Sequence, residues 1–135
     1  MELILQKLIK ESLLRWLETD WIHMLFNRFF GICTNMDDKS IKKIFIKTLT
    51  ILVKNNYLLL FSEVLSTKNV IDYSKEKSLN TLNNYKQFEP PENFMDTGLY
   101  TLNITDRWID LLNSKNYDEI VDKIVDKILK DSDSN

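Results

Sequence analysis

Apolar residues recur three or four positions apart along most of the chain, and this spacing predicts a mainly helical protein. The first predicted helix has one apolar side, which comprises Leu5, Leu8, Ile9, Leu13 and Trp16. A second helix is predicted from Asp20 to Phe30. Its apolar residues lie nearly all round the helix axis, which predicts a central position in the fold.

The third predicted helix has the clearest boundaries. It begins at Asp37 or Asp38, because an aspartate side chain can accept a hydrogen bond from the first turn of a helix. It ends at Asn55 and Asn56, since asparagine tolerates the left-handed backbone found at helix ends. One side of this helix is apolar, and another carries Lys39, Lys42, Lys43, Lys47 and Lys54.

The middle of the chain is less regular. The apolar run Tyr57–Phe61 fits a buried strand or a continued helix, and periodicity does not separate the two. A weak polar helix is predicted over Asp72–Phe88. Two prolines at positions 90 and 91 then break regular structure, and a short strand is predicted at Leu99–Leu102.

Two helices are predicted near the C-terminus. Thr105 has the position of an N-cap for a helix that contains Trp108, and Asn116 precedes a final helix with a continuous apolar stripe. Together these patterns predict one mainly α domain, a helical bundle with at most a small β element, over residues 1–130. Residues 131–135 are predicted to be a frayed tail.

Charge is distributed unevenly along the chain. Residues 1–88 contain thirteen basic and nine acidic residues, whereas residues 89–135 contain five basic and eleven acidic ones. Such an asymmetry indicates an interaction surface more than it indicates a fold.

Few residues are suited to catalysis. His23 is the only histidine and Cys33 the only cysteine, so neither a metal site nor a nucleophile paired with a base is predicted. Asp118, Asp122 and Asp126 follow one helix edge, and lysines beside them favour a solvated face over a metal site. We therefore predict a protein that is not an enzyme and that binds no cofactor or metal.

The lysines at positions 39–54 can contact phosphates, so a small helical nucleic-acid-associated regulator is one interpretation. An isoelectric point near 5.4 does not favour a dedicated nucleic-acid binder. A solvated helix face is therefore the preferred interpretation of these lysines.

The acidic back half is the better candidate for a binding surface. Aromatic side chains set among carboxylates suit a protein interface, because aromatic residues anchor interfaces and charge steers the encounter. The predicted partner-binding residues are Glu92, Asp96, Tyr100, Asp106, Trp108, Asp110, Asp118 and Asp122. In the alternative interpretation, Tyr100 and Trp108 belong to the core and the acidic residues only keep the protein soluble.

Three segments carry a family resemblance. Lys39–Leu59, with a polar start, a helix and an apolar exit, resembles small bacterial immunity proteins of contact-dependent growth inhibition systems. The Pro90–Phe94 loop followed by Thr105–Ile109 is similar in kind to the second half of those proteins. The resemblance implies a cytoplasmic inhibitor that binds a cognate toxin domain, often a nuclease such as a tRNase. It assigns no role to any single residue.

The chain has no apolar run of the roughly 20 residues that a membrane helix needs, and no signal-peptide pattern. With this, the resemblance implies a cytoplasmic immunity protein. It binds a toxin domain, and neither nucleic acid nor a membrane, and covers the basic active site of that domain.

Overall fold

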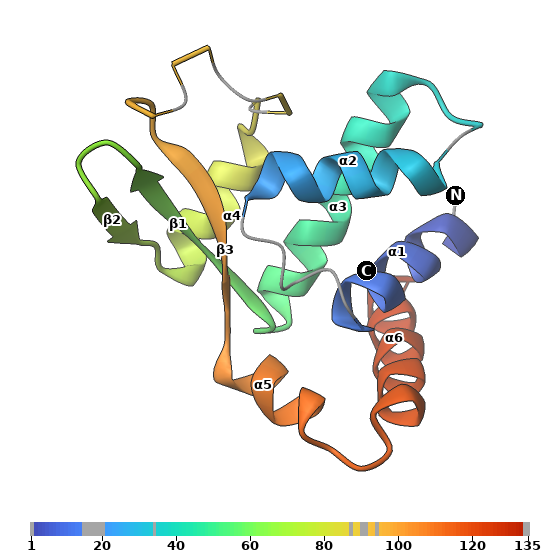
Figure 1. Ribbon diagram of the computed structural model, residues 1–135. Helices are drawn as coiled ribbons and strands as arrows, with labels where there is room; N and C mark the ends of the chain where they lie inside the picture. The colour runs from blue at the N-terminus through green and yellow to red at the C-terminus, as the bar shows by residue number, and fades with distance from the viewer. Residues whose placement is uncertain are drawn as a thin grey trace.

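The computed structural model describes residues 2–14, 21–33, 35–86, 88–89, 92–93 and 95–133. Within these ranges the chain forms six helices and three strands (Figure 1), in the order α1 (Glu2–Leu14), α2 (Ile22–Ile32), α3 (Asp38–Lys54), β1 (Leu58–Val64), β2 (Asn69–Asp72), α4 (Lys75–Asn83), β3 (Leu99–Ile104), α5 (Asp106–Leu112) and α6 (Tyr117–Asp133). Helices predominate, as predicted, but the β element is a complete three-stranded sheet. The fold is therefore mixed rather than a pure helical bundle.

The sheet is antiparallel and has the strand order β2-β1-β3. Leu60 of β1 lies opposite Leu102 of β3, and Ser62 lies opposite Ile71 of β2. The ambiguous run after α3 is thus a strand, and the strand predicted at Leu99–Leu102 is confirmed and longer. β2 was not predicted, because all four of its residues are exposed and leave no alternating apolar pattern.

The boundaries predicted for the third helix are confirmed. A side-chain oxygen of Asp37 accepts a hydrogen bond from the Ser40 amide at 2.7 Å, which caps the start of α3. At the other end, Asn56 has a φ angle of 67°, in the left-handed region that asparagine tolerates. This residue turns the chain from α3 into β1.

The polar helix of the middle region is shorter than predicted. α4 begins after Ser74, whose hydroxyl accepts from the Lys77 amide at 3.1 Å. Tyr85 and Phe88 lie beyond the end of α4, and their rings are 5.1 Å apart. Phe88 also packs edge-on against Phe26 with a ring separation of 4.9 Å, so this segment joins the aromatic part of the core.

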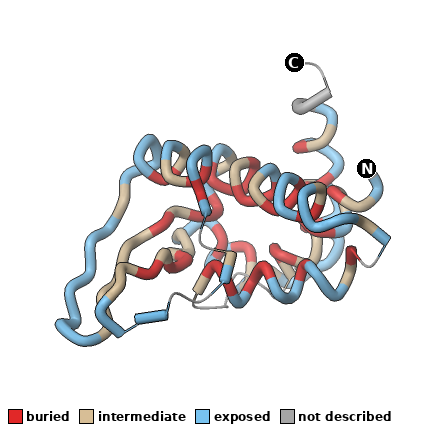
Figure 2. Tube along the Cα trace, turned by 90° about the horizontal axis from the view of Figure 1, so that it is seen from above, coloured by how far each residue is buried: buried red, intermediate tan, exposed pale blue. Residues whose placement is uncertain are grey.

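Every helix, together with β1 and β3, contributes buried residues to one core cluster. Figure 2 shows buried residues on the inner sides of the helices and exposed residues on their outer sides. α2 was predicted to be central: Ile22, Leu25 and Phe29 are fully buried, but Met24 and Phe30 are 43% and 42% exposed, so one side of the helix faces solvent. Trp16 and residues 134–135 of the predicted tail lie outside the described residues, and α6 continues to Asp133.

The helices pack against the sheet and against one another, and β3 connects two ends of the molecule. α4 lies against the sheet and beside α3, and α1 packs along α6 (Figure 1). Trp21, just before α2, forms an isolated bridge with Thr101 of β3, which joins the first helices to the sheet. β3 therefore runs from the loop around residues 92–97 at one end of the molecule to α5 at the other.

Candidate functional site

The predicted partner-binding residues fall into three separate groups. One group is on α5, a second is on the first turns of α6, and a third comprises the loop before β3 with Tyr100. Figure 1 shows the loop and α5 at opposite ends of β3. The six residues of that strand span ~20 Å at the usual rise of an antiparallel strand. The length of β3 therefore separates Glu92 and Asp96 from Asp106 and Asp110.

α5 is a short helix that is fixed firmly to the rest of the fold. Thr105 caps it, as predicted, and accepts from the Trp108 amide at 3.4 Å. The same hydroxyl donates to the backbone oxygen of Asn56 at 2.7 Å, which ties α5 to the end of α3. The orientation of α5 thus depends on contacts far away in the sequence.

Trp108 is a core residue and not an interface anchor. Its side chain is fully buried, and Nε1 donates to the Leu13 backbone oxygen at 2.8 Å. The Tyr117 hydroxyl donates to the same oxygen, so α1, α5 and α6 meet at one carbonyl group. A partner protein cannot reach the indole while the fold is intact.

The solvent side of α5 carries three exposed residues, of which the sequence predicted the two aspartates but not the isoleucine. Asp106 and Asp110 are exposed, one helical turn apart, as the sequence indicated. Ile109, the residue before Asp110, is 39% exposed, although its apolar character favoured a core position. Successive residues of a helix point about 100° apart, so a buried Trp108 turns Ile109 away from the same part of the core. We call Asp106, Ile109 and Asp110 the α5 patch.

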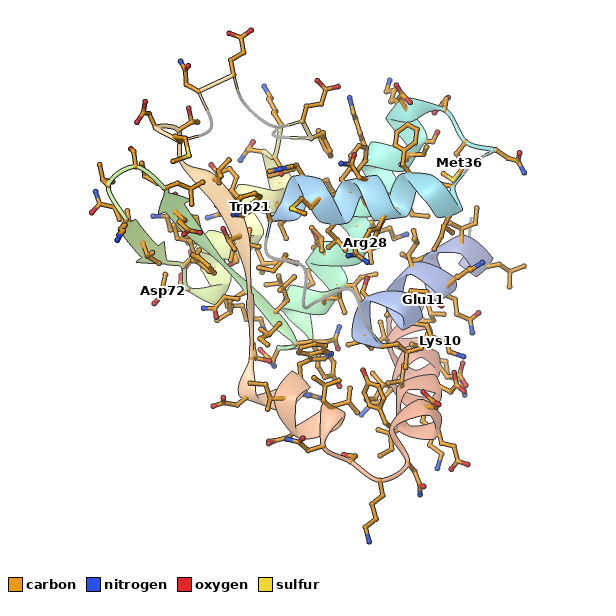
Figure 3. The ribbon with its side chains drawn as sticks, in the orientation of Figure 1. Lys10, Glu11, Trp21, Arg28, Met36 and Asp72 are labelled. Atoms are coloured by element: carbon orange, nitrogen blue, oxygen red, sulfur yellow. The ribbon has the colours of Figure 1, made fainter. Side chains whose placement is uncertain are left out.

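The carboxylates of α6 are not equivalent. Asp118 and Asp122 are both exposed and one turn apart. Asp122 forms an ion pair with Lys10 of α1, with a nitrogen–oxygen distance of 2.7 Å. Lys10 lies on the side of α1 that meets α6 (Figure 3), and its hydrogen bond to Asp122 raises the pKa of the lysine. Asp122 is therefore less available to a partner than Asp118.

The third group differs from the α5 patch in position and in kind. Glu92 and Asp96 are exposed in the loop before β3. Tyr100 is half-buried, and its ring lies 5.7 Å from that of Tyr85 and 6.3 Å from that of Tyr73. It packs among aromatic side chains near α4, so it does not serve the α5 patch. Phe94, which follows Glu92 in the sequence, lies outside the described residues.

The lysines of α3 are distributed over more than one side. Lys39, Lys43 and Lys47 are exposed at four-residue steps and share one helix edge. Lys42 lies over the Phe88 ring at 5.2 Å, a cation–π contact that uses its charge within the fold. The contiguous basic edge is thus narrower than the predicted face.

His23 and Cys33 are both buried. The His23 ring stacks on that of Trp21 with centroids 5.7 Å apart, and burial lowers its pKa. Burial likewise raises the pKa of Cys33, which disfavours its nucleophilic thiolate form at neutral pH. Across the described part of the chain, no group of three or more histidine, cysteine, aspartate or glutamate residues is placed to hold a metal ion.

The pKa of His23 predicts a pH dependence of folding. Because the folded state disfavours the imidazolium, stability should fall as pH drops below about 6.5, the usual histidine pKa in unfolded chains. Urea unfolding at pH 7.5 and at pH 5.5 measures this loss. The variant His23→Gln should lose much less stability between the two pH values. An equal loss in the variant would assign the effect to other groups.

Among the described residues, no helix combines the length and the apolar character needed to cross a membrane. Comparisons of the chain with protein-family models, with curated proteins and with solved structures gave no match.

Proposed function

We propose that this chain is a cytoplasmic immunity protein, a non-enzymatic inhibitor that binds a cognate toxin domain. The toxin is a nuclease, such as a tRNase, and the chain covers its basic active site. The observation that supports the proposal most is the α5 patch, in which two exposed carboxylates lie one turn apart and an exposed isoleucine lies to one side of them. Nucleases hold phosphates with cationic groups, and carboxylates on a helix can take the place of those phosphates.

The attachment of α5 to the core favours binding by this surface. Thr105 and Trp108 fix one side of the helix through hydrogen bonds to distant backbone oxygens. A surface that is already ordered loses little conformational entropy when a partner binds, so more of the contact energy appears as affinity. The α5 patch is therefore a better binding element than the loop that carries Glu92 and Asp96.

Each part of the α5 patch has a distinct role in the proposal. Ile109 is the apolar anchor, which a partner can cover and remove from water. Asp106 and Asp110 steer a basic partner toward it and then pair with its cations, and Asp118, exposed on α6, adds long-range steering. Association should consequently slow as salt concentration rises.

Co-expression tests the function directly. The toxin domain to use is the C-terminal domain of any large exported protein that the gene immediately upstream encodes. We expect that the domain arrests growth alone, that growth recovers when this chain is present, and that the two purify as an equimolar complex. Failure of both rescue and complex formation would overturn the proposal.

A nucleic-acid-associated function is the second candidate, and one observation favours it. Lys39, Lys43 and Lys47 form an exposed edge on α3, and no carboxylate follows Asp38 within that helix. Gel-shift assays with tRNA and with duplex DNA at moderate salt separate the two functions. The immunity proposal predicts no shift. A shift that is lost in the double variant Lys43→Gln/Lys47→Gln would favour the alternative.

A further inference from the structure

A small hollow of about 250 Å³ lies where α3 ends, α5 begins and α6 passes. Figure 1 shows these three segments in its lower part. Its lining comprises Asn55, Tyr57, Arg107, Ile124, Lys127 and Ile128. This volume is below that of most pockets for drug-sized ligands, so any occupant is compact.

The lining combines an apolar floor with a cationic rim. Tyr57 and Ile128 are almost completely buried, whereas Arg107 and Lys127 are exposed. None of the six described lining residues is a carboxylate, although Asp106 and Asp126 are sequence neighbours of the two cations. Positive charge at the rim of this hollow is therefore not balanced from within its own lining.

Arg107 is held in a way that leaves its donors available. The guanidinium carbon lies 4.7 Å from the centre of the Tyr57 ring, in a cation–π contact. A cation–π contact does not consume the N–H donors of the guanidinium group, which can still bind an anion. The described residues form no ion pair with Arg107 or with Lys127. A planar fork of this kind suits a carboxylate or phosphate group.

The walls of the hollow are connected by hydrogen bonds. The Asn55 side chain donates to the Ile51 backbone oxygen at 2.8 Å, and the Thr105 hydroxyl bonds to the Asn56 oxygen. Lys75 also donates to the backbone oxygen of Lys54 at 3.0 Å, which ties α4 to the same turn. The end of α3 and the start of α5 are thus fixed before any ligand arrives, which lowers the entropic cost of binding.

We infer that this hollow binds a compact organic anion, with a carboxylate or phosphate group between Arg107 and Lys127 and a small apolar body against Tyr57 and Ile128. The inference does not depend on the proposed function, because it uses a different set of side chains. It concerns two cations, Arg107 of α5 and Lys127 of α6, whereas the toxin-binding proposal concerns carboxylates.

NMR titration of the full ¹⁵N-labelled chain tests the inference. The probes are benzoate, phenyl phosphate and benzyl alcohol, which share a ring and differ in the head group. We expect saturable shifts of the Arg107 Nε–H and Asn55 side-chain signals with one or both anions, at millimolar dissociation constants. The anion that binds more tightly identifies the preferred head group. Benzyl alcohol should cause no saturable shift.

Substitutions locate the binding. Lys127→Gln and Arg107→Lys should each weaken binding by roughly tenfold, because a charge-assisted hydrogen bond is lost or loses its fork geometry. The matched control for Lys127→Gln is Lys123→Gln, which also removes one positive charge from α6. Lys123 lies outside the lining, so this variant should bind the anion with unchanged affinity. The absence of a saturable shift would overturn the inference. Equal weakening by Lys123→Gln, or equal binding of benzyl alcohol, would do so as well.

Discussion

Replacement of Trp108 by alanine is expected to lower the free energy of unfolding by about 3–5 kcal/mol, the usual cost of removing a large buried aromatic side chain. Trp108 is fully buried where α1, α5 and α6 meet, and it also satisfies the Leu13 carbonyl oxygen. Domains of this size are stable by only about 5–15 kcal/mol, so the variant should be close to unfolding. Urea denaturation followed by far-UV circular dichroism measures the loss.

Two further variants separate the contributions at this site. Trp108→Phe keeps most of the packing and removes one hydrogen bond. Its cost should be near 1 kcal/mol, because Tyr117 still donates to the same oxygen of Leu13. Ile109→Ala changes the adjacent, exposed residue and should cost within about 0.5 kcal/mol. If Trp108→Ala cost no more than Ile109→Ala, the assignment of Trp108 to the core would be wrong.

Charge reversal on the α5 patch should have the largest effect on the proposed toxin binding. In Asp106→Lys/Asp110→Lys, two attractive contacts with a basic active site become repulsive. We expect the dissociation constant to rise at least thirtyfold, which corresponds to about 2 kcal/mol. The slowing of association by salt that is expected for the natural chain should also largely disappear in this variant. Surface plasmon resonance at low and at physiological salt measures both quantities.

The control reverses the charge of two acidic residues at the other end of β3. Glu92→Lys/Asp96→Lys changes the net charge by the same amount on an exposed loop. Its effect on affinity should be several times smaller, since only long-range steering is altered. Equal weakening by the two double variants would mean that net charge, and not the α5 patch, determines binding.

The sequence predicted the elements whose signals are local. The Asp37 cap of α3, the Thr105 cap of α5 and the apolar stripe of α6 depend on neighbouring residues, and each element begins close to its predicted position. β2 was missed because all four of its residues are exposed, and its pairing with β1 leaves no mark on the apolar pattern of the sequence. The orientation of α2 could not be predicted, since nearly every side of that helix is apolar.

The candidate site was predicted less well, because it depends on tertiary contacts. Asp106 and Asp110 were correctly placed on one helix, but Trp108 and Ile109 could not be sorted into core and surface from a helix of seven residues. The Leu13 carbonyl, which selects the buried position of Trp108, is ninety-five residues away. The separation of Glu92 and Asp96 from α5 likewise follows from the course of β3 through the fold.

Hydrogen exchange of this chain, free and in complex with the toxin domain, tests the central claim most directly. The proposal predicts that binding increases amide protection in α5 and in the first turns of α6, while the exposed edge of α3 at Lys39–Lys47 is unchanged. Protection confined to α3, or to the loop around Asp96, would contradict the proposal that α5 covers the active site of a toxin.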